Sequence, residues 1–394
     1  MRKIIGEKVL AVAFVGLIST VGVGMVLAED TKISELENRE MASFPLVEKD
    51  DDLLSGEYFG KFETYYNDQV YKREEWLQLY SSFKKEFMKE KEVNGVFLGE
   101  DGYLLQAVDK IENLKDEHQQ INKFIEYGDS KGLDVYYTMA PTKVMSNKDK
   151  LPAFAEDFSQ KNMNNFLEGL SPKAEQINLR KTIEKKNQEE QLYFYTDHHW
   201  KQKAAFYGYQ QVIKELSEKH PEVGEPKKFS DFNVKTYKEP EFYGSAARLS
   251  NKAYAEKADQ IEIMEPKEGY DGYDVCIKGE CGQPFYDLSK QGDKEMYADR
   301  YNVYMGGNAS QIVVKNEKAD NDLKVLVLKD SYANPMIPLL SAHFKEVHVV
   351  DLRLNGGNMY DYLNKQDLDM VLFVHNVSSA IQTPNLYTFE GRSK

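Results

Sequence analysis

Short apolar runs alternate with segments of helical periodicity along this chain, and that alternation restricts the possible folds more than any other feature. Near the C-terminus the apolar runs span residues 325–328, 346–350 and 370–374, and a helical segment follows each of the first two. Runs this short and this rich in branched side chains are typical of strands buried on both faces. Earlier in the chain, helices are expected at residues 114–131, 163–170 and 201–216, and strands at 133–139 and 193–195. The sequence therefore predicts an α/β fold with a parallel sheet and helices on both of its faces.

The N-terminus carries a stretch without charge, residues 9–28, after the basic pair Arg2-Lys3. This stretch matches the ~20 residues needed to cross a bilayer, and the leading basic residues favour an N-terminus on the cytoplasmic side. Residues 1–28 are therefore expected to be a signal peptide or a transmembrane anchor, with the rest of the chain outside the cytoplasm. Val26-Leu27-Ala28 leaves open whether a peptidase cleaves the segment.

Three further regions follow. Residues 29–92 are expected to form an acidic stalk and a helical segment, and residues 93–394 the main domain. The main domain opens with a predicted hairpin whose turn is at residues 100–101. Residues 222–320 interrupt the alternation of strands and helices, so we interpret them as a β-rich insertion that covers the functional crevice.

Composition excludes one class of function. The formal net charge of -14 and the pI near 5.2 argue against nucleic-acid binding, which requires clustered basic residues. The 26 tyrosines could stack on sugars, although core packing explains most of them. Cys276 and Cys281 are expected to form a local disulfide outside the cytoplasm, because no further ligands for a metal accompany them.

A serine stands where the apolar run 323–328 ends and a helical segment begins. Side chains at the carboxyl end of a parallel strand face the usual ligand crevice, and backbone N–H groups at a helix start can stabilise an oxyanion. Ser331 is therefore a candidate nucleophile. Capping of the helix by Asp330 and Ser331 explains the same residues without catalysis.

A second segment, Thr196-Asp197-His198-His199-Trp200, places an acid beside two of the seven histidines. A serine hydroxyl needs an imidazole to take its proton and a carboxylate to fix that imidazole's tautomer, and His199 and Asp197 could supply both. In this interpretation His198 is structural. A helix cap with surface histidines, or a metal site, could also explain the segment, but metal sites usually have three or four protein ligands.

These segments carry a family resemblance over residues 37–377. The chain resembles the DHHW-motif proteins of Gram-positive bacteria, which are similar to the AlgX/AlgJ-type alginate O-acetylation proteins with SGNH-hydrolase-like domains. Besides residues 196–200 and 330–331, the matching positions are residues 37–39, 54–56, Tyr65, Asp68, Arg73, 95–99, 102–104, 140–143, 242–245, 306–308 and 351–353.

The resemblance implies a three-layer α/β/α fold of the SGNH-hydrolase type and an extracytoplasmic serine O-acetyltransferase that acts on a surface or secreted polysaccharide. The acetyl group would come from a membrane-bound O-acyltransferase, and no cofactor or metal is implied. Ser331 matches the nucleophile, His199 the base, Asp197 the acid and Arg353 an active-site arginine. Where typical SGNH enzymes have Gly-Asp-Ser, this chain has a lysine at position 329.

Four residues are candidates for substrate binding or for the oxyanion site: Arg353, Lys143, Tyr332 and Asn308. Arg353 could instead pair with a neighbouring aspartate, Lys143 could lie in a solvated loop and Asn308 in a turn. Two other functions stay open, namely a polysaccharide O-acetylesterase and a non-catalytic protein that binds or assembles glycans.

Overall fold

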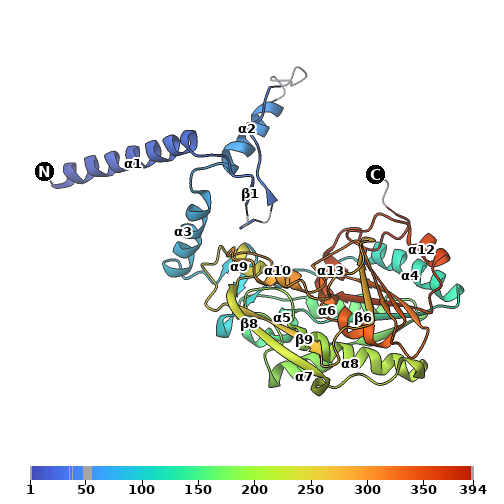
Figure 1. Cartoon of the computed structure of the whole chain (residues 1–394). Coiled ribbons are helices and arrows are strands. Elements are labelled where there is room, and N and C mark those ends of the chain that lie inside the picture. Colours follow the sequence, from blue (N-terminus) through green and yellow to red (C-terminus); the bar gives the residue numbers. More distant parts are fainter. Residues whose placement is uncertain (1, 35, 38, 48–55, 392–394) are drawn as a thin grey trace. The chain divides into compact units, whose positions relative to one another are not determined.

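The computed structural model describes residues 2–34, 36–37, 39–47 and 56–391 (Figure 1). It consists of two compact units, one of residues 1–90 and 248–254 and the other of residues 91–247 and 255–394. Residues 48–52 of the expected stalk and residues 53–55 of the expected helical segment lie outside the described residues, as does Asn38.

The first unit begins with the predicted apolar helix, α1 (Arg2–Leu27), which is long and apolar enough over Lys8–Leu27 to cross a membrane. A short hairpin and two helices follow: β1 (Ile33–Ser34), β2 (Arg39–Glu40), α2 (Glu57–Asp68) and α3 (Arg73–Glu86). Arg39 donates two hydrogen bonds to the carboxylate of Asp68, at 2.8 and 2.6 Å. This bidentate pair lowers the pKa of Asp68 to about 2 and ties the hairpin to α2.

The second unit is built on one sheet of seven strands in the order β10-β11-β13-β12-β14-β6-β7. Their bounds are β6 (Asp134–Ala140), β7 (Ala174–Asn178), β10 (Tyr273–Ile277), β11 (Gln311–Asn316), β12 (Lys324–Lys329), β13 (Glu346–Asp351) and β14 (Met370–Asn376). The strands from β13 to β7 run parallel, whereas β11 and β10 join antiparallel at one edge. After β12 the chain forms β13 on one side of it and then β14 on the other, so the sheet has a topological switch point at β12. Ligands of open α/β sheets bind at such a point, beyond the carboxyl ends of the strands.

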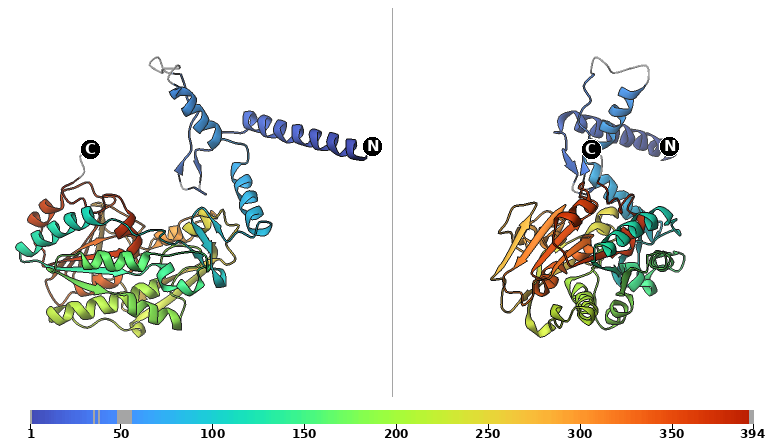
Figure 2. Two further views of the ribbon diagram at one scale, coloured as in Figure 1. Left: turned by 180° about the vertical axis from the view of Figure 1, so that it is seen from behind. Right: turned by 90° about the vertical axis from the view of Figure 1, so that its right-hand side faces the viewer.

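Alternate residues of the central strands face two separate cores. Val325 and Val327 of β12 belong to one core, and Leu326 and Leu328 to the other. Figure 2 shows helices on both faces of the sheet. One face is covered by α4 (Lys115–Ser130), α6 (Ser159–Glu168), α12 (Met359–Lys365) and α13 (Val377–Gln382), and the other by α7 (Arg180–Glu189), α8 (Gln202–Lys219) and α11 (Ile337–Leu340). This three-layer arrangement confirms the predicted α/β/α fold class.

The remaining elements of this unit are short or lie beside the sheet. They are β3 (Glu92–Val93), β4 (Val96–Leu98), β5 (Leu104–Leu105), α5 (Lys143–Ser146), β8 (Phe232–Phe242), α9 (Ser245–Leu249), β9 (Asp259–Pro266) and α10 (Leu288–Gln291). The first three form a small sheet, and β8 pairs with β9. Residues 222–320 are thus rich in strands, as predicted, but their last two strands, β10 and β11, extend the main sheet.

One predicted strand is wrong. Residues 193–195 form no strand, and Tyr193 makes only an isolated bridge to Trp200. The strand β7 takes the position in the sheet that was expected for residues 193–195. Its buried and exposed residues do not alternate simply and several are polar, so hydrophobic periodicity did not predict it. The segment 193–195 is instead the start of a tight loop that leads into α8.

Cys276 and Cys281 form a disulfide, as the sequence predicted. The two cysteines are five residues apart in sequence, so the bond closes a short loop from β10 to the turn after it. Because β10 is already paired with β11 over five residues, replacing both cysteines by serine should lower the free energy of unfolding by only about 2 kcal/mol. Denaturant unfolding of the two proteins measures this difference. A loss of the whole cooperative transition would contradict this local role.

Candidate active site

Buried polar groups hold the loop that contains the two adjacent histidines. The carboxylate of Asp259 in β9 accepts hydrogen bonds from the backbone N–H of Tyr195, and from the N–H and Oγ1 of Thr196, at 2.6–2.7 Å. The Nζ of Lys143, which follows β6, donates to the carbonyl oxygens of Tyr195 at 3.1 Å and Asp197 at 2.6 Å. The loop is therefore fixed on both sides of Thr196.

Lys143 is buried, and burial lowers its pKa to about 8, although the carboxylates of Asp259 and Asp197 partly offset this effect. A neutral amine still has two N–H groups for its two carbonyl partners, so the contacts do not require the charge. The structure corrects the candidate role of Lys143 in substrate binding. This side chain supports the loop from inside the protein.

Asp197 is clamped in one orientation. Its Oδ1 accepts the backbone N–H of His199 at 2.9 Å, and its Oδ2 accepts the N–H of Ser245 at 2.9 Å. Gly244 packs directly against it, because a Cβ at position 244 would lie 2.2 Å from the Cβ of Asp197. Glycine is therefore the residue that allows the segment before α9 to approach the loop so closely.

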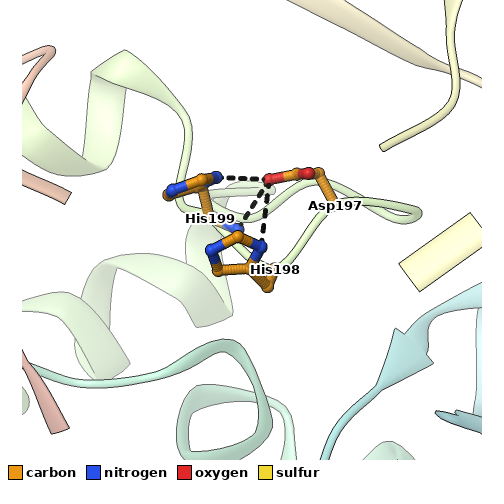
Figure 3. Close-up of side chains that lie close together, drawn as sticks. All are labelled: Asp197, His198 and His199. Atoms are coloured by element: carbon orange, nitrogen blue, oxygen red, sulfur yellow. Dashed lines mark hydrogen bonds and ion pairs between the residues drawn. The ribbon is translucent and has the colours of Figure 1, made fainter. Parts of the chain in front are cut away.

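Asp197, His199 and Ser331 form a continuous chain of hydrogen bonds. The Nδ1 of His199 lies 2.6 Å from the Oδ1 of Asp197, and its Nε2 lies 2.7 Å from the Oγ of Ser331. Figure 3 shows the Asp197 carboxylate beside both histidines, with dashed lines to each of them. All three members of the chain are buried.

The protonation states follow from these contacts. Burial raises the pKa of Asp197, but the charges of His199 and His198 and the hydrogen bonds to the carboxylate outweigh it and hold the pKa well below its usual value. An ionised carboxylate only accepts hydrogen bonds, so the Nδ1 of His199 carries a proton. The Nε2 is then free to accept the hydroxyl hydrogen of Ser331, which is the tautomer that a general base requires.

Ser331 follows directly after β12, at the switch point of the sheet. Asp330 fixes this corner: its Oδ1 accepts the N–H of Tyr332 at 2.8 Å, and its Oδ2 accepts the N–H and Nδ2 of Asn376 at 2.7 and 2.6 Å. The expected helix after the serine is broken into short turns, and α11 begins only at Ile337. Within the described residues, no hydrogen bond engages the backbone N–H of Ser331.

Two aromatic rings flank the imidazole of His199. The ring of Tyr301 stacks on it with centroids 3.7 Å apart and an interplanar angle of 6°, and the ring of His198 lies 3.7 Å away at 37°. The hydroxyl of Tyr301 also donates to the carbonyl oxygen of Ser331 at 3.0 Å. The base is therefore held in place by ring contacts as well as by its hydrogen bonds.

Lys329 points into the protein and satisfies a polar network behind the serine. Its fully buried Nζ donates to Asn334 Oδ1 at 2.7 Å, to Asn308 Oδ1 at 2.9 Å and to Asp351 Oδ2 at 3.3 Å. Burial lowers the pKa of Lys329, and the charge of Asp351 offsets part of this effect. Arg353 binds both oxygens of Asp351, at 2.9 and 2.6 Å. The arginine therefore takes the structural pairing that the sequence left open.

Tyr332 is buried, and its polar groups are engaged within the protein. Its N–H donates to Asp330, its hydroxyl donates to the carbonyl oxygen of His198 at 2.6 Å, and its carbonyl accepts from Trp200 Nε1 at 2.8 Å. We therefore correct its candidate role in substrate or oxyanion binding. Tyr332 connects the serine corner to the histidine loop.

The geometry disfavours the metal-site interpretation of the histidine loop. Asp197, His198 and His199 place possible ligand atoms within 4.8 Å of one another. Two ligands at ~2.1 Å from a tetrahedral ion lie roughly 3.4 Å apart, whereas the acid and imidazole atoms are 2.6 Å apart and hydrogen-bonded. In a second group of possible ligands, Asp274 with Cys276 and Cys281, the two sulfurs are joined to each other.

Sequence reasoning missed Asp259 and Tyr301. Each contacts the site across a long stretch of chain, 63 residues from Asp259 to Thr196 and 30 from Tyr301 to Ser331. Both lie in the region interpreted as an insertion, where no periodic pattern marks single positions. The only signal was that this region was expected to cover the crevice.

The fold and the site define an α/β protein with an acid–histidine–serine chain at the carboxyl edge of its sheet. The family model described as DHHW protein matches residues 174–350 of this chain, in line with the resemblance noted from the sequence. A search of curated proteins found no match.

Several solved structures are similar to this chain. PatB1 of Bacillus cereus with a sulfonyl adduct is 24% identical, has a TM-score of 0.65, and covers 75% of this chain and 98% of its own. A DHHW family protein from Eubacterium siraeum DSM 15702 is 19% identical with a TM-score of 0.61, covering 77% of this chain and 98% of its own. The O-acetyltransferase domain of Pseudomonas putida AlgJ is 14% identical with a TM-score of 0.44, covering 75% of this chain and 95% of its own. The likeness to the first two shows the fold.

Proposed function

We propose that this chain is an extracytoplasmic serine O-acetyltransferase that acetylates a cell-surface or secreted polysaccharide through an acetyl-Ser331 intermediate. The observation that carries the proposal is the chain of short hydrogen bonds from Asp197 through His199 to the Oγ of Ser331. Such a chain has the chemistry of acyl transfer, because it couples a hydroxyl nucleophile to an oriented base.

The reaction proceeds in two halves. The Oγ of Ser331 attacks the acetyl carbonyl carbon of the donor while His199 Nε2 takes its proton, and the proton then passes to the leaving oxygen of the donor. In the second half His199 takes the proton of a sugar hydroxyl, whose oxygen attacks the acetyl group on Ser331. The new ester leaves, and the proton returns to Ser331 Oγ. Asp197 stays ionised and stabilises the imidazolium in both halves.

We assign two donors to the oxyanion that forms on the acetyl oxygen. One is the backbone N–H of Ser331, which no other described residue engages. The other is the Nδ2 of Asn308. The Oδ1 of Asn308 accepts from Lys329 Nζ at 2.9 Å and from Asn334 Nδ2 at 3.2 Å, so its amide can present only Nδ2 outward.

A double-mutant cycle tests the coupling of Lys329 and Asn308. Because one oxyanion donor contributes about 100-fold in kcat, Asn308→Ala should lower kcat by that factor. Lys329→Met should lower kcat to a similar extent, since it releases the asparagine amide. The double variant should lose no more than either single variant, and kcat should fall more than KM rises.

The matched control is Lys324→Met, at the opposite end of β12, where the Nζ of the lysine pairs with an exposed aspartate. It should leave kcat unchanged. Losses at Lys329 and Asn308 that multiply would contradict the coupling, and an unchanged rate in Asn308→Ala would remove this residue from the oxyanion site.

The N-terminal helix and the disulfide support the proposed location. A helix able to cross a membrane precedes the enzyme, and a disulfide lies on the second unit, as is usual outside the cytoplasm. A membrane-bound O-acyltransferase is the proposed source of the acetyl group. The polysaccharide acceptor would then meet the serine on the outer side of the membrane.

The test uses the full chain in detergent with 4-nitrophenyl acetate. Acid quenching early in the reaction should trap an acetylated peptide that contains Ser331, as detected by mass spectrometry. Added oligosaccharide should then become acetylated at the expense of free acetate. Acetate as the product with every acceptor would favour the esterase, and the absence of both acetyl-Ser331 and ester cleavage would favour a non-catalytic glycan-binding protein.

A further inference from the structure

His198 is the half-exposed member of the histidine pair, and the proposed reaction leaves it without a role. Its side chain is 45% exposed, whereas that of His199 is only 7% exposed. Two rings cannot both lie 3.7 Å from one face of the same imidazole, so His198 covers the face of His199 opposite Tyr301. His198 is therefore a solvent-facing ring in direct contact with the catalytic base (Figure 3).

Ser245 is the hydrogen-bond partner of His198 Nδ1. The Oγ of Ser245 lies 2.6 Å from His198 Nδ1 and accepts the backbone N–H of His198 at 3.3 Å. We assign the hydroxyl hydrogen of Ser245 to this bond, so that Nδ1 is its acceptor. A neutral imidazole that accepts at Nδ1 carries its hydrogen on Nε2. No hydrogen bond joins this Nε2 to the residues that the structure describes.

Ser245 itself is held by the acid of the triad. Its backbone N–H donates to Asp197 Oδ2 at 2.9 Å, and the carbonyl of His198 accepts from Tyr332, beside the serine nucleophile. The exposed N–H of His198 is thus positioned by the same contacts that position the acid and the serine. A donor fixed in this way costs little further ordering when it binds a partner.

We propose that His198 Nε2–H binds an oxygen of the acceptor sugar next to the hydroxyl that receives the acetyl group. This inference rests on the proposed function. The centroids of the two imidazoles are only 3.7 Å apart, so both rings lie within reach of adjacent oxygens on one sugar. A sugar whose reacting hydroxyl meets His199 Nε2 can therefore offer its next oxygen to His198.

The consequence is selection between sugar and water. Water also reacts with an acetyl-serine, but a water molecule bound to His199 gains nothing from a second donor beside it. The contact to His198 holds the sugar hydroxyl in line with the acetyl carbon and so favours transfer over hydrolysis. His198 then determines the fate of the intermediate, whereas Ser331 and His199 determine its formation.

The test compares acylation with partition in the full chain. The release of 4-nitrophenolate reports acylation of Ser331, and the ratio of acetylated oligosaccharide to free acetate reports partition. His198→Phe keeps a ring against His199 and removes the donor, so it should lower this ratio about tenfold and lower nitrophenolate release by a much smaller factor. His198→Gln restores an N–H donor and should recover part of the ratio.

Ser245→Ala is the matched variant. It keeps the backbone N–H that donates to Asp197 and removes only the hydroxyl that sets the tautomer of His198, so the partition ratio should fall by an intermediate factor.

Three outcomes overturn the inference. If the wild-type protein acetylates an oligosaccharide and His198→Phe keeps the same ratio, the acceptor contact is absent while the transferase function stands. If nitrophenolate release and the ratio fall by the same factor, His198 acts only by holding His199. Acetate as the sole product of the wild-type protein contradicts both the transfer reaction and the role of His198.

Discussion

Replacing Ser331 by alanine is expected to lower ester cleavage by roughly 10⁴- to 10⁶-fold. The substitution removes the Oγ that lies 2.7 Å from His199 Nε2 and leaves the base without a nucleophile to activate. His199→Ala should lose about as much, and the double variant no more than either, because serine and histidine act as one unit. Initial rates of 4-nitrophenyl acetate cleavage measure these losses.

Ser310→Ala is the control for a serine deleted elsewhere in the same unit, and its rate should match the wild type. Mass spectrometry adds an independent measurement, since acetyl should appear on Ser331 of the wild type and be absent from Ser331→Ala. A Ser331→Ala protein that keeps more than about one hundredth of the rate would show that another group carries the cleavage.

Gly244→Ala is expected to have the second largest effect, although residue 244 itself performs no chemistry. The added Cβ would lie 2.2 Å from the Cβ and 2.3 Å from the Oδ2 of Asp197. The acid must then move away from His199, and a displacement of about 1 Å in a catalytic group costs on the order of 100-fold. The upper limit is the ~10⁴-fold loss that follows when the carboxylate function is removed.

The comparison variant is Gly356→Ala, because nothing lies within 4 Å of a Cβ at that position. Both variants are assayed for kcat/KM and for their thermal unfolding midpoint. Gly244→Ala should have a lower kcat/KM although its unfolding midpoint stays well above the assay temperature. Gly356→Ala should keep the wild-type kcat/KM and the wild-type midpoint. Activity within threefold of wild type in Gly244→Ala would mean that the contact to Asp197 relaxes without moving the imidazole.

The sequence predicted the sheet well where the strands are buried on both faces. Residues 325–328 and 370–374 belong to the central parallel strands β12 and β14. Both runs are continuously apolar because the alternate side chains of each strand enter two different cores. The strand β7 was missed because it lies at the edge of the sheet and exposes polar residues. Periodicity detects burial, and an edge strand has less of it.

The site was predictable only in its chemistry. The residue types at Asp197, His199 and Ser331 were sufficient to suggest an acid, a base and a nucleophile. Their supports were not, because Asp259, Tyr301 and Lys329 act through contacts that only the folded chain creates. The exposed side of His198 was likewise hidden, since two adjacent histidines look equivalent in a sequence and become different only when one of them is buried.

The site consists of two halves, the histidine loop and the serine corner, and the reactive hydrogen bond between His199 and Ser331 connects them. The acid and base are part of one loop, two residues apart, while the nucleophile lies 132 residues away from the base at the end of a central strand. Trp200 and Tyr332 cross-link the halves through two hydrogen bonds, at 2.8 and 2.6 Å. Any motion that separates the halves therefore breaks these two hydrogen bonds together with the His199–Ser331 contact, but it leaves the acid–base pair intact. Such a site can be switched off by a small shift of the loop and restored without rebuilding the charge arrangement around the imidazole.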